Sequence, residues 1–122
     1  SMTTDAPRRR VLVVEDEMLV AMMVQDILEE LGLEVAGICR HLEEAVKAAT
    51  SDPVDFVLLD VNLEGKRSFP VADVLRARNI PFVFATGYGG DALEAAYADV
   101  PTIAKPYMPG DIKQALEQAG MI

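Results

Sequence analysis

The sequence predicts an α/β fold with a five-stranded parallel sheet, and three observations support this prediction. Short apolar runs alternate along the chain with amphipathic segments, five of each. Most of the runs are apolar at every position, as in strands that are buried on both faces of a parallel sheet. The chain has 122 residues, of which 51% are hydrophobic, and this length suits one domain. Right-handed crossovers then place helices on both faces of the sheet, which gives a three-layer (βα)5 sandwich.

The expected elements follow one another without a long linker. The expected strands cover residues 11–14, 34–38, 56–59, 82–85 and 102–104. The expected helices are one over residues 16–31, one over 42–49, one from 70, one from 91 and one over 109–119. At this length the flavodoxin-like strand order 2-1-3-4-5 is the natural arrangement of the sheet.

Signals for helix ends appear in the first half of the chain. Asp16 follows the first strand and is placed to cap the first helix. Gly32 follows the last apolar residue of that helix and favours a C-terminal stop. The pair Asp52-Pro53 ends the second, alanine-rich helix.

The second half of the chain carries similar signals. Pro70 suits the first turn of the third helix, and Pro81 opens the fourth strand. Asp91 and Glu94 follow a glycine-rich turn and have the spacing of a capping box, with Asp in place of Ser or Thr. A fourth helix is therefore expected there. Pro109 starts the last helix.

Polar residues follow the expected strands at one edge of the sheet. Glu15 and Asp16 follow the first strand, and Asp60 follows the third. Thr86 and Lys105 follow the fourth and fifth strands. In an open α/β sheet, ligands bind beyond the carboxyl ends of the strands, and the first and third strands are neighbours in the expected order. The three carboxylates are therefore expected to share one crevice.

This set of residues predicts phosphoryl-transfer chemistry. Three close carboxylates repel one another, and a divalent cation or an ammonium relieves the repulsion. Oxygen ligands suit Mg²⁺, and Lys105 can supply the ammonium. Asp60 can act as a nucleophile that accepts a phosphoryl group, while Thr86 supplies a hydroxyl donor.

The order and spacing of these residues resemble the receiver domain of two-component response regulators. The resemblance covers about residues 10–119, and its carriers are Glu15, Asp16, Asp60, Thr86, Lys105 and Pro106. It implies a phosphoacceptor switch that uses Mg²⁺ and takes its phosphoryl group from a sensor histidine kinase or a histidine phosphotransfer protein. Such a switch is not an enzyme beyond its self-catalysed phosphorylation and dephosphorylation.

The resemblance also implies a role for each matching residue. Asp60 matches the phosphoacceptor, and Glu15 and Asp16 match the acidic pair that holds Mg²⁺. Asn62 matches the position that gives the ion a backbone carbonyl. Thr86 matches the switch hydroxyl that binds the phosphoryl oxygen.

The last part of the chain both follows and departs from the family pattern. Lys105 matches the lysine that pairs with the phosphoryl group, and the resemblance allows a cis peptide before Pro106. Most receivers carry Tyr or Phe where this chain has Thr102, so the usual aromatic switch cannot operate. We expect Tyr88 to replace it. Pro106 and Tyr107 are expected with these two residues on the switch and partner surface.

Two further stretches of sequence bear on the subgroup. Residues 80–89 resemble stand-alone bacterial receivers with a Pro-Phe-x-Phe-Ala-Thr-Gly-Tyr signature. Residues 61–65, after the expected phosphoacceptor, lack the Met-Pro pair that is common in the family, so the path of this loop is left open.

Composition excludes several other classes. With 20 acidic against 11 basic residues, the net charge of -9 argues against a nucleic-acid surface. One cysteine, Cys39, excludes a disulfide framework, and no apolar run is long enough to span a membrane. A cytoplasmic protein, monomeric or weakly dimeric, is expected. Ser1 ahead of Met2 suggests a cloning remnant, so residues 1–8 are expected to be a disordered tail before a receiver domain over 9–122 that signals through a separate partner protein.

Three alternatives remain open from the sequence. A pseudo-receiver would use the same fold only to bind proteins. A phosphatase that resembles haloacid dehalogenases would form an aspartyl phosphate, but it needs a second acid where this chain has Asn62. A flavin-binding protein fits the fold, but the acidic loop Glu15-Asp16-Glu17 repels phosphate unless a metal intervenes.

Overall fold

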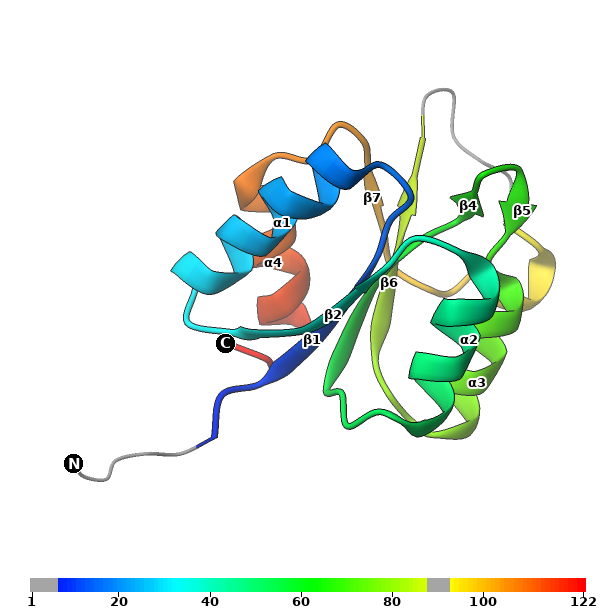
Figure 1. Ribbon diagram of the computed structural model, residues 1–122, viewed down its shortest axis with the longest axis horizontal. Coiled ribbons are helices and arrows are strands. Elements are labelled where there is room, and N and C mark those ends of the chain that lie inside the picture. The colour runs from blue at the N-terminus through cyan, green and yellow to red at the C-terminus, as the bar shows by residue number, and fades with distance from the viewer. Residues whose placement is uncertain (1–6, 88–92) are drawn as a thin grey trace.

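The computed structural model describes residues 7–87 and 93–122, and a parallel five-stranded sheet forms its centre (Figure 1). The strand order is β2-β1-β3-β6-β7, which is the predicted order 2-1-3-4-5 when the strands of this sheet are counted along the chain. The strands are β1 (Arg10–Val14), β2 (Glu34–Cys39), β3 (Phe56–Asp60), β6 (Phe82–Thr86) and β7 (Thr102–Ala104). The prediction of a flavodoxin-like α/β fold is thus confirmed.

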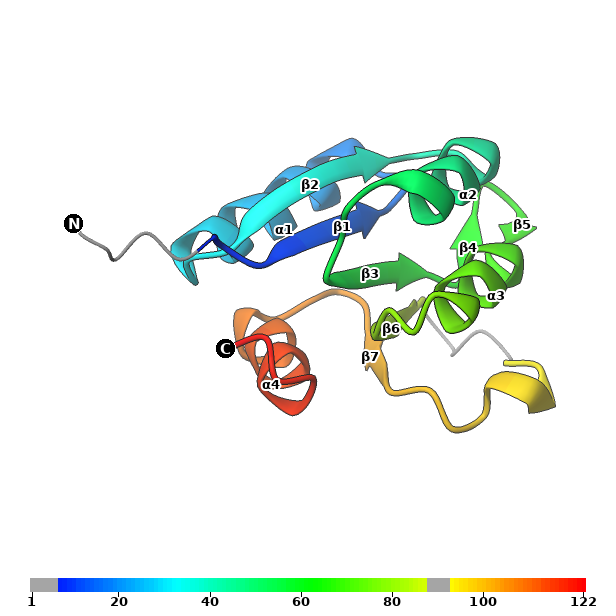
Figure 2. The same ribbon diagram turned by 90° about the horizontal axis from the view of Figure 1, so that it is seen from below.

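Helices cover both faces of the sheet, as right-handed crossovers require. The four α-helices in the described part of the chain are α1 (Met18–Glu30), α2 (Leu42–Ser51), α3 (Phe69–Ala77) and α4 (Pro109–Gln118). The pair α1 and α4 lies on one face, and α2 and α3 lie on the other (Figures 1 and 2).

The sheet divides the hydrophobic core into two halves, because alternate residues of a strand face opposite sides. On β1, Leu12 and Val14 pack toward α2 and α3, whereas Val11 and Val13 pack toward α1 and α4. All five residues of β3 are buried. This explains why the central strands are apolar at every position, and it makes the buried carboxylate of Asp60 at the end of β3 an exception.

The start of the first helix differs from the prediction. The N-cap residue of α1 is Glu17, which makes no side-chain cap, and not Asp16. The Oδ2 atom of Asp16 instead accepts a hydrogen bond of 2.9 Å from the backbone N–H of Glu64. The Asp16 carboxylate is therefore engaged by a tertiary contact that a local capping pattern does not reveal.

The expected fourth helix is also different. Asp91 lies outside the described residues, and between residues 93 and 101 the chain forms only the 3₁₀ helix η1 (Ala95–Tyr97). The side chain of Glu94, the N-cap residue of η1, makes no capping bond. Tyr97 ties this segment to α3 instead, since its hydroxyl donates to Asp73 and its ring stacks on Phe69 at 4.9 Å.

The loop after Asp60 forms a small hairpin of strands β4 (Asn62–Leu63) and β5 (Lys66–Arg67). Glu64 and Gly65 connect the two strands with φ angles of +50° and +86°. Two such residues are what a type I′ turn requires, and this turn matches the twist of a hairpin. The hairpin contacts the loop before α2, where His41 Nδ1 lies 2.6 Å from Glu64 Oε1.

Two further expectations concern membrane-spanning helices and the single cysteine. Within residues 7–87 and 93–122, none of the helices combines the length and apolar character needed to cross a bilayer. Cys39 is a buried free thiol, and burial raises its pKa to about 11. The thiol therefore behaves as a small apolar group.

Candidate functional site

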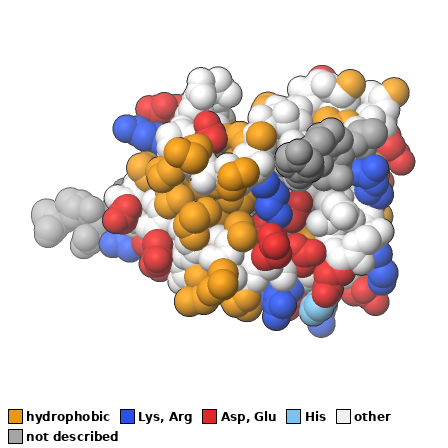
Figure 3. Space-filling view, turned by 90° about the horizontal axis from the view of Figure 1, so that it is seen from above, with side chains coloured by type: hydrophobic (Ala, Val, Ile, Leu, Met, Phe, Trp, Pro, Cys, Tyr) orange, Lys and Arg blue, Asp and Glu red, His pale blue; other side chains and the backbone are white. Residues whose placement is uncertain are grey.

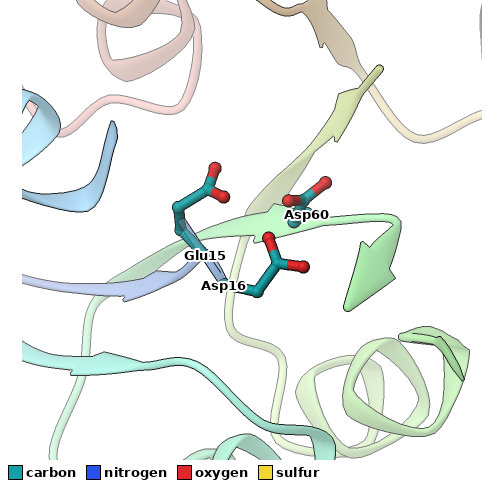
Figure 4. A group of neighbouring side chains, drawn as sticks. All are labelled: Glu15, Asp16 and Asp60. Atoms are coloured by element: carbon teal, nitrogen blue, oxygen red, sulfur yellow. The ribbon is translucent and has the colours of Figure 1, made fainter. Parts of the chain in front are cut away.

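Three carboxylates meet at the carboxyl edge of the sheet (Figure 4). Glu15 and Asp16 directly follow β1, and Asp60 is the last residue of β3. These strands are parallel neighbours, with Val14 beside Leu59, so their ends carry the three side chains to one place. An oxygen of each carboxylate lies within 4.8 Å of an oxygen of the other two. The predicted shared crevice is confirmed.

Lys105 brings an ammonium group into this cluster from the end of β7. Its Nζ atom lies 2.9 Å from Asp60 Oδ2 and 2.9 Å from Glu15 Oε1. Glu15 and Asp60 are only 1% and 3% exposed, whereas Glu17, at 3.9 Å from the same ammonium, lies at the surface. Two buried carboxylates therefore share one ammonium, which leaves an excess of negative charge in a place with little water.

Burial is the main cause of the pKa shifts in the cluster. Burial raises the pKa of Glu15 to about 7 from an ordinary 4.5, against the backbone N–H of Glu17 and the ammonium of Lys105. Burial likewise raises the pKa of Asp60, while Lys105 opposes the shift. Burial lowers the pKa of Lys105, but the hydrogen bonds and charges of Asp60 and Glu15 outweigh it and raise the pKa above its ordinary value.

The donor set of the cluster fits a hard divalent cation. All three acidic residues offer oxygen, the ligand type that Mg²⁺ prefers. Oε1 of Glu15 is buried and makes no hydrogen bond of good geometry, although Lys105 lies beside it. Asp16 is half-buried and retains a second oxygen besides the one bonded to Glu64. A cation here would neutralise the charge that a single ammonium leaves uncompensated.

Hydrogen bonds from neighbouring residues hold the three acidic residues in position. The backbone N–H of Glu15 donates to the carbonyl of Cys39 at 2.9 Å, and Arg40 Nε donates to the carbonyl of Asp16 at 3.2 Å. The backbone N–H of Asn62 donates to Asp60. No sequence pattern predicts the role of Arg40, because a one-dimensional pattern does not indicate where a long side chain turns back.

Thr86 and Lys105 complete the edge of the site. Thr86 is the last residue of β6. It directly follows Ala85, which lies beside Asp60 in the pairing of β6 with β3. Its hydroxyl donates a long hydrogen bond, 3.5 Å, to the carbonyl of Ile103. The Thr86 carbonyl accepts from the backbone N–H of Lys105 at 2.9 Å, so the two residues are held together. The peptide between Lys105 and Pro106 is cis, as the resemblance allows.

The residues expected on the switch and partner surface differ in their exposure to solvent. Tyr88 lies outside the described residues. Thr102 and Pro106 are exposed, as a surface role requires. The placement of Tyr107 on the surface is wrong, because its side chain is 4% exposed and packs under α1 and α4. Sequence position alone could not reveal this, since a loop residue has no periodicity that separates an inward from an outward side chain.

An apolar patch lies beside the acidic cluster, and its size was not expected (Figure 3). Exposed large side chains of α1 and of the loop before α4 form it: Met18, Leu19, Met22, Met23 and Met108. A hollow of about 450 Å³ lies between the patch and the cluster, with Glu17, Met23, Lys105 and Tyr107 in its lining. Apolar groups gathered at the mouth of a charged site are typical of a protein-binding surface.

Known proteins with similar structure share this arrangement of sheet and helices. SdrG from Sphingomonas melonis Fr1 superposes with a TM-score of 0.82 at 39% identity, over 92% of this chain and 96% of that one. A second solved structure of SdrG, in a beryllofluoride-activated conformation, matches 93% of this chain and 96% of that one with a TM-score of 0.77 at the same identity.

Curated relatives match in sequence over most of this chain. The phyllosphere-induced regulator PhyR of Methylorubrum extorquens is 34% identical over 117 residues, which are 89% of this chain and 42% of PhyR. The transcriptional regulatory protein PdtaR of Mycobacterium tuberculosis is 32% identical over 124 residues, 96% of this chain and 60% of PdtaR. The chain thus spans about half the length of these relatives.

A comparison with protein families identifies the family of the chain. The sequence profile described as the response regulator receiver domain matches residues 11–117, nearly the whole chain. With its acidic cluster and lysine intact, the chain belongs to the response regulator receiver domain family.

Proposed function

We propose that this receiver accepts a phosphoryl group on Asp60 from a phosphohistidine of a sensor kinase or histidine phosphotransfer protein, and that it signals through a separate protein. The observation that carries the proposal is the position of the Asp60 carboxylate. It is buried at a strand end, 2.9 Å from an ammonium and within 4.8 Å of two further carboxylates. A carboxylate in such a place can act as a nucleophile toward phosphorus.

The transfer is a simple displacement. An oxygen of Asp60 forms a bond to phosphorus while the phosphorus–nitrogen bond of the phosphohistidine breaks, and the imidazole nitrogen takes up a proton. Bound Mg²⁺ would spread the negative charge of the transferring oxygens. We assign its binding to Glu15, Asp16, Asp60 and the backbone carbonyl of Asn62.

Lys105 and Thr86 act on the product. The ammonium that now pairs with the Asp60 carboxylate moves to a phosphoryl oxygen, because the phosphoryl group carries more charge than the carboxylate it modifies. The hydroxyl of Thr86, whose hydrogen bond to the Ile103 carbonyl is long, turns toward another phosphoryl oxygen. These two movements carry the change to Tyr88, the expected substitute for the missing aromatic switch, and to the exposed Thr102 and Pro106 of the partner surface.

The apolar patch is the docking surface for the phosphodonor protein. A donor must bring its imidazole to Asp60, and the patch formed by Met18, Leu19, Met22, Met23 and Met108 lies beside that site (Figure 3). Methionine side chains adapt to different partner shapes, which suits a transient complex. The cytoplasm, where histidine kinases present their phosphohistidine, is the expected location.

Incubation with a small phosphodonor tests the proposal. Acetyl phosphate and Mg²⁺ should give a base-labile phosphoryl adduct that intact-protein mass spectrometry detects. Asp60→Asn, which keeps the size of the side chain, should give none. An undiminished adduct on Asp60→Asn would overturn the assignment, and so would the absence of any adduct on the unmodified chain.

Variants of the patch test docking separately. Met22→Glu should slow transfer from a cognate kinase at least tenfold and leave labelling by acetyl phosphate unchanged, because only the protein donor uses the patch. Ile122→Glu is the matched control, since Ile122 is also an exposed apolar residue but belongs to the C-terminus. Equal kinase rates for both variants would exclude the patch as the docking surface.

A further inference from the structure

Two buried polar atoms near the acidic cluster lack hydrogen bonds of good geometry. Three such side-chain atoms occur in the described part of the chain: Glu15 Oε1, Ser68 Oγ and Tyr107 Oη. Buried polar groups in folded proteins nearly always find a partner, because an unsatisfied one costs about 1–3 kcal/mol. A carboxylate oxygen can only accept and a phenol can donate, so the first and last of the three are complementary.

These two groups are also neighbours. Tyr107 follows Lys105 by two residues, and Lys105 contacts Glu15. Burial, followed by the charges of Glu15 and Asp60, raises the pKa of Tyr107. The Glu15 carboxylate also raises the pKa of Tyr107 as a nearby hydrogen-bond acceptor, although neither Tyr107 Oη nor Glu15 Oε1 has a hydrogen bond of good geometry.

We propose that Tyr107 is a positioning residue of the acidic site, whose hydroxyl donates a hydrogen bond to Glu15 and fixes the orientation of that carboxylate. The ring is held among apolar side chains of the core half beneath α1 and α4, so the hydroxyl has a rigid base. Phenylalanine would fill the same core space without a donor. The proposal rests on the proposed function only in that it takes Glu15 to be a metal ligand.

As a consequence, the Glu15 carboxylate would be held in the orientation that it needs to bind the metal ion. Groups that orient a metal ligand commonly contribute ten- to a hundredfold to metal affinity. Glu15 otherwise has the ammonium of Lys105 and the backbone N–H of Glu17 to hold it, and the first of these is free to turn toward a phosphoryl group. Tyr107 would keep the carboxylate in place when Lys105 leaves it.

Binding of Mg²⁺ to three chains tests the proposal. Titration followed by ¹H–¹⁵N NMR should give a Kd about tenfold higher for Tyr107→Phe than for the unmodified chain. Tyr97→Phe is the matched control, because it also removes a buried tyrosine hydroxyl but one that bonds to Asp73 on the far side of the sheet, and its Kd should not change. In a Glu15→Gln background, Tyr107→Phe should change the Kd less than twofold.

A measurement without metal keeps the outcomes separate. The ¹³Cζ resonance of Tyr107 should shift when Glu15→Gln replaces the charged acceptor, and that of Tyr97 should not. A Kd for Tyr107→Phe equal to that of the unmodified chain would overturn the proposal, and so would a ¹³Cζ resonance indifferent to Glu15. If the unmodified chain bound no Mg²⁺, the proposed function would fail, and the metal-free resonance alone would decide the role of Tyr107.

Discussion

The ammonium of Lys105 lies 2.9 Å from the carboxylate of Asp60, although 45 residues separate them in the chain. The same ammonium lies 2.9 Å from Glu15, so one cation serves two buried anions. Each of these three residues stands at the end of a strand of the same sheet. The charge balance of the site is therefore built into the fold, and it can be tested without any partner protein.

Replacing Lys105 should lower the free energy of unfolding, because the two buried carboxylates then lose their counter-charge. Lys105→Met removes the ammonium and leaves Glu15 and Asp60 without a counter-charge, which should lower the free energy of unfolding by about 3 kcal/mol at pH 8. The loss should be smaller at pH 5.5, where the carboxyl groups can take up protons, and added Mg²⁺ should restore part of it. Urea unfolding measures each value.

Lys113→Met is the control for this variant. Lys113 lies on the exposed side of α4, and its replacement should change the free energy of unfolding by less than about 0.5 kcal/mol. Equal stability of Lys105→Met and the unmodified chain at pH 8 would show that the ammonium does not balance the cluster.

The raised pKa of Glu15 predicts how stability depends on pH without metal. In the unfolded chain the group titrates near 4.5, and in the folded chain near 7. Between these values the folded chain binds a proton that the unfolded chain has lost, so the free energy of unfolding should fall as the pH rises from about 4.5 to about 7. The raised pKa of Asp60 acts in the same direction.

Urea unfolding in EDTA across this window measures the slope. Glu15→Gln should flatten it, because the amide does not titrate. Mg²⁺ should stabilise the protein more at pH 8 than at pH 5.5, since metal ligands must be deprotonated. A free energy of unfolding that rose with pH between 5 and 7 in EDTA would contradict the assignment to Glu15.

The convergence of the site residues could be predicted because the sheet is parallel. Asp60, Thr86 and Lys105 end apolar runs, and the carboxyl ends of parallel strands must lie at one edge. The run ends are visible in the sequence as the first polar residue after a buried strand. Neither the distances nor the choice of Asp60 and Glu15 as the partners of Lys105 follows from that pattern, because they depend on side-chain directions.

Local signals were less reliable where tertiary contacts compete with them. Asp16 has the position of a helix cap, but the backbone N–H of Glu64 takes its carboxylate. Asp91 and Glu94 have the spacing of a capping box, but the part of that segment described by the structure is bound to α3 through Tyr97. In each case a partner distant in sequence is decisive, and a short window of sequence does not contain it.

The hairpin turn beside the acidic site makes a separate prediction. Gly65 has a φ of +86°, which costs about 1–2 kcal/mol for a residue with a Cβ atom, so Gly65→Ala should lower the free energy of unfolding by about that amount. The preceding residue, Glu64, donates its N–H to Asp16, so the variant should also weaken Mg²⁺ binding. Thermal unfolding and an Mg²⁺ titration measure the two effects.

Gly110→Ala is the matched substitution for the turn variant. Gly110 lies in the first turn of α4, and no atom would approach an added Cβ within 4 Å. Alanine should leave stability unchanged or raise it by up to about 1 kcal/mol. Equal effects of the two substitutions would show that the left-handed turn does not constrain residue 65.

The contact between η1 and α3 predicts that one substitution will speed up amide hydrogen exchange locally. Tyr97→Phe removes the hydroxyl that donates to Asp73, and this should cost about 1 kcal/mol. Because the stacked ring on Phe69 and the guanidinium of Arg76, 4.8 Å from the ring, both remain, the segment should loosen without unfolding. Hydrogen exchange should speed up at the amides of residues 95–100 and stay unchanged in α4.

Asp99→Asn is the comparison, since the Arg76–Asp99 ion pair is exposed and its loss should cost less than about 0.5 kcal/mol. Uniformly faster exchange across the whole chain in Tyr97→Phe would instead indicate that this tyrosine supports global stability and does not fasten one segment.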